Sequence, residues 1–205
     1  MNRKTFALSA LLSAFLAGCV STGGVEMVDI RSDRGEAVVG LDYRDFEGAA
    51  SAAVQGMLSG RALDNPRGGR YVVMISRVTN DTMQRIDTDQ LIRKIRIEML
   101  NSGKAVVTTA VGGSGPDDSA SYQVRDELRN NREFDQRGVQ REGTLQAPDL
   151  SLSGKILQRN LSMSGGRQQI EYYFMLTLTD LASGLAIWEN EYPIVKRASN
   201  RSVAW

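Results

Sequence analysis

The chain has 205 residues, and its 25 Lys and Arg against 24 Asp and Glu give a formal net charge of +1 at pH 7. This balance gives no electrostatic reason to expect a nucleic-acid partner. Histidine is absent and Cys19 is the only cysteine, which removes the usual general base, the Ser-His-Asp and Cys-His pairs and the common zinc ligands. Carboxylates remain, but their spacing selects no catalytic pair. We expect no enzyme, no metal or other cofactor, and no small-molecule substrate.

The first 19 residues have the organisation of an export signal. Arg3 and Lys4 precede a short apolar run, which ends in the Leu-Ala-Gly-Cys motif of residues 16–19. The run is too short for a membrane span, which takes about 20 apolar residues, and it is typical of a secretory signal peptide. The motif resembles a bacterial lipobox, in which the Cys19 thiol is acylated and becomes the new N-terminus. The alternative is an ordinary signal peptide with an incidental cysteine.

Lipidation at Cys19 predicts the organisation of the whole chain. We expect a signal peptide over residues 1–18, a lipidated flexible tether over residues 19–41 and one globular domain over residues 42–205. The tether is rich in Ser, Thr, Gly and mixed charge, as flexible linkers are. In lipoproteins that this segment resembles, Asp after the lipidated cysteine retains the protein in the inner membrane. Val20 stands there instead, which implies a lipid anchor in the outer membrane and a domain facing the periplasm.

Helices and strands are expected to alternate in the first half of the domain. Residues 46–60 show apolar side chains at helical spacing, with Asp45 as the expected N-cap. Residues 71–78 are almost entirely apolar, as in a buried strand. A second amphipathic helix is expected to begin after Asp87, and another strand is expected over residues 104–111. Strand, helix and strand at this spacing favour a parallel pair with a right-handed crossover.

The second half divides into a polar segment and a strongly alternating one. Residues 112–148 are polar, and either form a helix over residues 119–134 capped by Asp118 or are a weakly docked insertion. Residues 150–194 alternate apolar and polar side chains around two turns, which predicts an antiparallel three-stranded meander with one apolar face. The two amphipathic helices need that face to bury against. We therefore expect an α/β fold with a small mixed sheet of about five strands and helices packed on it.

Three stretches carry a family resemblance. They are Tyr-Val-Val-Met-Ile-Ser-Arg-Val-Thr-Asn at residues 71–80, the segment 86–104 that opens Ile-Asp-Thr-Asp-Gln-Leu, and residues 172–191, where Thr-Asp-Leu precedes Gly184 and Trp188. Together with the motif at Cys19 they resemble the LpoB-type outer-membrane lipoproteins, over about residues 41–197. The fold that this implies resembles the N-terminal domain of the TolB protein.

The resemblance implies a regulator of cell-wall synthesis without catalytic activity. In that family the domain contacts the small regulatory domain of a class A penicillin-binding protein and stimulates peptidoglycan synthesis. The present chain departs from the family in two places, since its tether lacks a long Pro-rich stretch and residues 112–148 match poorly. Two alternatives remain. One is a subunit of a CsgG-like secretion pore, which would need additional alternating apolar hairpins; the other is a structural lipoprotein that binds envelope proteins or peptidoglycan.

The alternating strands also suggest where a protein partner would bind. If the apolar register of the meander is core, a partner must use the other face, the edges or the turns. Lys155, Arg159 and Tyr173 fall on that other register, and Arg167 lies beside the neighbouring turn. Arg and Tyr are the residue types that most often anchor protein interfaces. We predict a partner-binding patch formed by these four residues; the alternative is an ordinary solvated sheet face.

Overall fold

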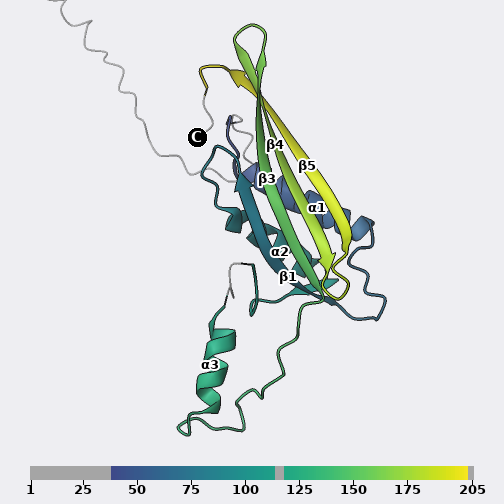
Figure 1. The fold of residues 1–205 in the computed structure, drawn as a ribbon, viewed down its shortest axis with the longest axis vertical. Coiled ribbons are helices and arrows are strands. Elements are labelled where there is room, and N and C mark those ends of the chain that lie inside the picture. The colour runs from purple at the N-terminus through teal and green to yellow at the C-terminus, as the bar shows by residue number, and fades with distance from the viewer. Residues whose placement is uncertain (1–37, 114–117, 203–205) are drawn as a thin grey trace, which may run out of the picture. The chain divides into compact units, whose positions relative to one another are not determined.

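The computed structural model describes residues 38–113 and 118–202. The predicted signal peptide, Cys19 and most of the predicted tether lie outside these residues. The elements are α1 (Tyr43–Ser59), β1 (Tyr71–Asp81), α2 (Thr88–Asn101), β2 (Ala105–Val107), α3 (Ala120–Arg129), β3 (Leu150–Met163), β4 (Arg167–Asp180) and β5 (Ala186–Ser199) (Figure 1). None of the described helices is long and apolar enough to cross a membrane.

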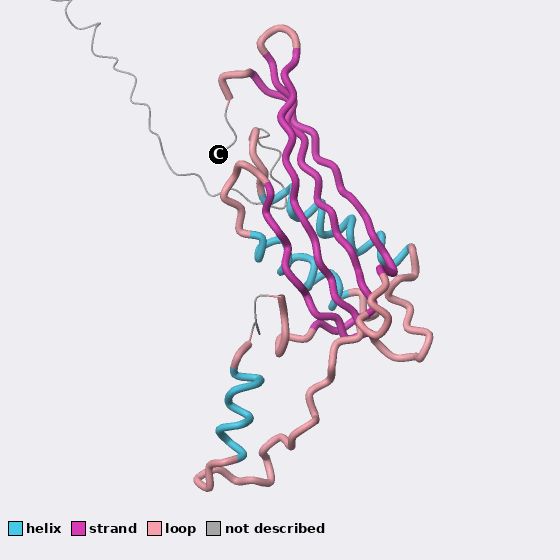
Figure 2. The backbone as a smooth tube through the Cα atoms, viewed as in Figure 1, coloured by secondary structure: helices cyan, strands magenta, loops and turns pink. Residues whose placement is uncertain are grey.

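The strands form one mixed sheet in the order β2-β1-β3-β4-β5 (Figure 2). β1 runs parallel to both β2 and β3, whereas β3, β4 and β5 are antiparallel neighbours. The reversal from β3 to β4 uses Gly165 and Gly166, whose φ angles of 73° and 67° lie in the left-handed region that glycine adopts most readily. The predicted α/β fold, with a five-stranded mixed sheet and an antiparallel meander, is confirmed.

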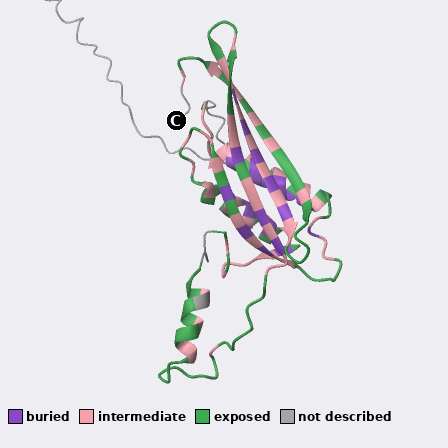
Figure 3. Cartoon of the chain, in the orientation of Figure 1, coloured by how far each residue is buried: buried purple, intermediate pink, exposed green. Residues whose placement is uncertain are grey.

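One hydrophobic core joins α1 and α2 to a single face of the sheet. The even-numbered side chains of β4 from Ile170 to Leu178 are buried in it, together with Leu152 and Ile156 of β3 (Figure 3). α1 can approach β5 closely because its facing residues are small. A Cβ added to Gly48 would lie 3.1 Å from the Tyr192 hydroxyl. The backbone of α1 at Gly48 therefore lies close to the Tyr192 side chain of β5.

The first helix begins three residues earlier than predicted. Asp42, not Asp45, is its N-cap: the Asp42 carboxylate accepts from the amides of Arg44 and Asp45. The Asp45 carboxylate in turn accepts from the Asp42 amide at 2.8 Å. This reciprocal arrangement is a capping box with Asp at both positions. The apolar pattern of residues 46–57 predicts the helix correctly, but two acids three residues apart look alike in sequence.

The segment before α1 is fastened to the sheet. Lys196 of β5 donates to the Gly40 carbonyl at 2.6 Å and forms an ion pair with Asp45 at 2.6 Å. The Leu41 amide donates to Gln84 Oε1 at 3.1 Å. The Tyr172 hydroxyl lies 3.5 Å from the carbonyl of Val39. Residues 38–42, which we call the N-terminal strap, are therefore bonded to β4, to β5 and to the connection between β1 and α2.

The second strand is shorter than predicted. Only residues 105–107 pair with β1, instead of the expected 104–111. β1 itself is irregular between Ile75 and Val78, and the chain returns to it at Gly113, whose amide donates to the Ile75 carbonyl. A Cβ at Gly113 would stand 2.4 Å from the Arg77 amide nitrogen. A regular ladder cannot continue beside this irregularity, so the strand ends early.

The polar insertion contains α3 and, among its described residues, no strand. α3 spans ten residues, fewer than the expected 119–134, and its N-cap position is Ser119 with no side-chain cap bond; Asp118 accepts from the Ala120 amide instead. Side-chain hydrogen bonds connect α3 to the returning chain, from Arg125 to the Arg141 carbonyl and from Gln136 to the Leu128 carbonyl. The described insertion thus lacks the apolar hairpins that a secretion-pore subunit would need.

Candidate protein-docking face

The face of the sheet opposite α1 and α2, here called the outer face, is uncovered by any described helix. It carries the odd-numbered side chains of β3, β4 and β5, because successive side chains of a strand point to opposite sides. Even-numbered residues of β3 and β4 supply the core, among them Ile156, Ile170, Tyr172 and Phe174. Glu171 and Tyr173 therefore each lie between two buried neighbours, whereas the neighbours of Arg159 and Arg197 are exposed or half-buried.

All four sequence-predicted residues lie on this face, and two of them, Arg159 and Tyr173, are in contact. Leu157 pairs with Tyr173, and Arg159 pairs with Glu171 in the β3–β4 register. The Arg159 guanidinium lies over the Tyr173 ring, 5.5 Å from its centroid, a cation–π contact. Arg167 is exposed at the start of β4, opposite Met163 and further along the sheet. Arg167 thus belongs to the same face but does not join the Arg159–Tyr173 pair.

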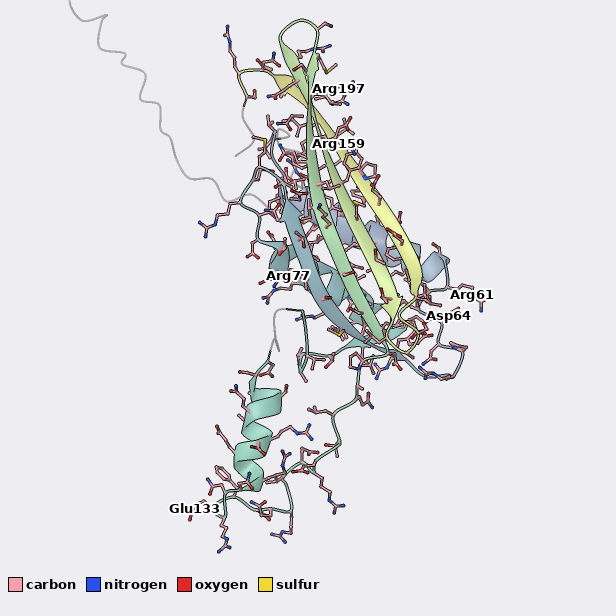
Figure 4. The ribbon with its side chains drawn as sticks, in the orientation of Figure 1. Arg61, Asp64, Arg77, Glu133, Arg159 and Arg197 are labelled. Atoms are coloured by element: carbon pink, nitrogen blue, oxygen red, sulfur yellow. The ribbon has the colours of Figure 1, made fainter. Side chains whose placement is uncertain are left out.

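Lys155 differs from the arginines because its charge is already offset. Its ammonium forms an ion pair with Asp81 of β1 at 2.7 Å. By contrast, Arg159 and Arg167 form no ion pair with any described carboxylate, and neither does Arg197 of β5. The available positive charge of the outer face therefore lies toward the end of the sheet where Figure 4 labels Arg159 and Arg197.

A hydrogen-bond network extends the pair across β4 to β5. The Tyr173 hydroxyl donates to Glu171 Oε2 at 2.6 Å, and Gln169 donates to Glu171 Oε1 at 2.7 Å. Arg197 Nε donates to Gln169 Oε1 at 2.9 Å. We call Arg159, Gln169, Glu171, Tyr173 and Arg197 the outer-face network. It fixes two arginines and one tyrosine in defined positions on three adjacent strands.

The network also shifts the pKa values of Glu171 and Tyr173. The hydrogen bonds from Tyr173 and Gln169 lower the pKa of Glu171, with Arg159 assisting. The Glu171 carboxylate in turn raises the pKa of Tyr173. Both shifts move the titrations away from neutral pH, so neither group suits proton transfer there. The described residues contain no group of His, Cys, Asp or Glu that could hold a metal ion.

Sequence reasoning missed Gln169, Glu171 and Arg197. Gln169 and Glu171 could have been predicted from the sequence, because they are odd-numbered residues of β4 and so point to the same side as Tyr173. Arg197 could not, since its place beside Gln169 depends on the β4–β5 register. The Asp81 partner of Lys155 was missed for the same reason: it lies on a strand 74 residues away in sequence, paired in parallel with β3.

Comparison with known proteins now bears on the function. The sequence model of the family described as "Peptidoglycan-synthase activator LpoB" matches residues 45–194, from the first turn of α1 into β5. The chain belongs to the LpoB family. Its members are non-enzymatic regulators, so the prediction of a non-enzymatic activator from the resemblance is confirmed, and membership indicates a lipoprotein that activates a peptidoglycan synthase.

Solved structures of LpoB are among those similar to this chain. The C-terminal domain of LpoB from Escherichia coli shares 15% identity, with a TM-score of 0.40, and the match covers 74% of this chain and 99% of that one. The corresponding domain from Salmonella enterica shares 15% identity with a TM-score of 0.39, and the match covers 73% of this chain and 98% of that one. Lipoprotein GNA1162 from Neisseria meningitidis shares 9% identity with a TM-score of 0.39, and the match covers 62% of this chain and 84% of that one. No curated protein sequence matched the chain.

Proposed function

We propose that this LpoB-family protein is anchored to the outer membrane through Cys19 and activates a class A penicillin-binding protein by docking its outer face on that enzyme's regulatory domain. The observation that carries the proposal is the outer-face network. Arg159, Tyr173 and Arg197 are held ready on the one face of the sheet that no described helix covers. Side chains already fixed before binding lose little conformational freedom when the complex forms.

The composition of the outer face supports a protein partner. Leu157, Tyr173 and Pro193 form an apolar row across β3, β4 and β5. Arginines without carboxylate partners among the described residues lie on one side of this row. An apolar centre with Arg and Tyr anchors is the common pattern of protein interfaces. The partner surface should therefore present acidic side chains around an apolar centre, since arginines that form no ion pair with a described carboxylate favour carboxylates on a partner.

The test is stimulation of a purified class A penicillin-binding protein by the full chain. Arg159→Glu should abolish the stimulation, because it reverses a charge and removes the cation–π contact, and adding Lys155→Glu should not restore it. Arg93→Glu is the matched control, because Arg93 is exposed on α2, away from the outer face. Wild-type stimulation by Arg159→Glu would move the contact elsewhere, for instance to residues 79–85 or to the insertion.

The anchoring part of the proposal is tested separately. Cys19→Ser should prevent incorporation of labelled palmitate and release the protein from outer-membrane fractions, because the thiol is the only acylation site that the motif provides. Label entering the Cys19→Ser chain would overturn the assignment of Cys19. Label confined to inner-membrane fractions of the wild type would overturn the outer-membrane assignment alone.

A further inference from the structure

Among the described strands, β5 forms one edge of the sheet with 14 residues, and no described strand pairs with its outer side. Long exposed edge strands offer unpaired amides and carbonyls to other chains, and proteins usually block them. The opposite edge is β2, which has only three residues. β5 is therefore the longer of the two edge strands, and a further strand could pair with it along its whole length.

The hydrogen-bond phase of β5 follows from one backbone bond at its end. The Asn200 amide donates to the Gly166 carbonyl at 3.0 Å, and residues 166 and 200 continue the register of Arg167 with Ser199. In an antiparallel ladder, bonded and non-bonded pairs alternate. The even-numbered residues from Ala198 back to Trp188 therefore bond to β4. The backbone groups of residues 189, 191, 193, 195 and 197 point outward, to the free edge.

Pro193 occupies the middle of those outward positions. It stands opposite Tyr173 in a non-bonded pair, so its missing amide hydrogen costs no bond to β4. On the outer side it removes the central donor, and its ring takes the place where a neighbouring strand would approach. Proline is tolerated in sheets at such edge positions.

The rest of the edge is complementary to itself. Glu189 and Arg197 lie four residues on either side of Pro193, and both point to the outer face and are exposed. In an antiparallel pair of two β5 strands centred on residue 193, Glu189 of each copy would stand opposite Arg197 of the other. Opposite charges directly across a strand pair are stabilising. The exposed Val195 would pair with Glu191, so no like charges meet in this register.

We propose that Pro193 closes the edge of β5 against pairing with a second copy of this chain. An edge with matching charges would join two copies strand to strand, and the outer faces of both would then become one continuous surface. The proline keeps the edge unpaired, so each copy presents its own outer face. This inference concerns the edge of the sheet and does not depend on the proposed docking partner.

The test is the oligomeric state of the full chain, purified in mild detergent and measured by analytical ultracentrifugation over a range of concentrations. Pro193→Thr restores the outward amide with a residue that favours strands. It should lower the dimer dissociation constant at least ten-fold relative to the wild type. Val195→Thr, which changes an outward residue but keeps the proline, should behave as the wild type. Circular dichroism of each variant identifies any that fail to fold.

Charge variants test the register. Adding Arg197→Glu to Pro193→Thr should return the chain to the wild-type dissociation constant, because Glu189 of each copy then faces a second carboxylate, at position 197 of the other. Adding Glu189→Arg as well should restore the tight dimer. The proposal is overturned if folded Pro193→Thr associates no more tightly than the wild type. It is also overturned if neither charge change alters the dissociation constant of the Pro193→Thr dimer, or if Val195→Thr dimerises as tightly as Pro193→Thr.

Discussion

The two sides of β4 show how one strand separates stability from recognition. Even-numbered residues such as Tyr172 and Phe174 are buried against α1 and α2. Odd-numbered neighbours such as Glu171 and Tyr173 are partly exposed and bonded to one another across the outer face. Adjacent residues of β4 therefore have different roles: one stabilises the core and the next is available for binding. A substitution at one should change unfolding without touching binding, and a substitution at the next should do the reverse.

The strongest test of this comparison is a truncation on the inner side. Phe174 meets Phe46 of α1 edge to face, with ring centroids 5.9 Å apart and planes at 81°. Phe174→Ala leaves a cavity in the core and should cost about 3–5 kcal/mol in the free energy of unfolding. Urea unfolding followed by circular dichroism measures the loss. A cost below about 1 kcal/mol would mean that the inner side is not the main support of the fold.

The N-terminal strap should give the next largest effect. The Lys196 and Asp45 side chains are only 12% and 13% exposed, so removing Lys196 leaves a poorly solvated carboxylate. We expect Lys196→Ala to cost about 2–4 kcal/mol. Lys94→Ala is the matched control: its ion pair with Glu47 has side chains 30% and 46% exposed, and exposed pairs contribute about 0–1 kcal/mol. Equal losses in the two variants would contradict the special role of the strap.

The inner side should also respond to alkaline pH. Burial, with a contribution from Asp45, raises the pKa of Tyr172 to about 12, whereas a tyrosine in the unfolded chain titrates at about 10. The resulting stability is fully present below about pH 10 and is lost as pH rises to about 12. A shift of this size corresponds to about 2.7 kcal/mol, and solvent screening reduces the loss to about 2 kcal/mol. Tyr172→Phe should flatten this dependence in unfolding experiments between about pH 9 and 12. An unchanged slope in Tyr172→Phe would assign the alkaline loss to other groups.

The outer side should give the smallest effect on stability and the largest on function. Tyr173→Ala removes the cation–π partner of Arg159 and the hydrogen bond to Glu171, both at the surface. Its unfolding free energy should change by no more than about 0.5 kcal/mol, while stimulation of the synthase falls. A fall in stability comparable to that of Phe174→Ala would show that the two sides are not separate.

The sequence predicts this separation because alternation is a local signal. Period-two patterning identified the buried and exposed sides of β3 and β4, and amphipathic spacing located α1 and α2. Features that depend on pairing were missed: Arg197 joins the outer-face network through the β4–β5 register, and Asp81 neutralises Lys155 across β1 and β3. The short β2 depends on the irregularity of β1. Local chemistry alone could not choose Asp42 over Asp45 as the cap.

The N-terminal strap has a mechanical consequence. Any tension carried along the chain from residues 1–37 enters the domain at Val38, immediately before the bonds of Gly40 to Lys196 and of Leu41 to Gln84. Under such a force, these bonds and the Lys196–Asp45 ion pair would be loaded before the first turn of α1, because they lie nearer to Val38 along the chain or hold its neighbours. Since Lys196 belongs to β5, the pull passes directly into the last strand of the sheet. The strap thus joins the beginning of the described domain directly to β5, the last strand of the sheet.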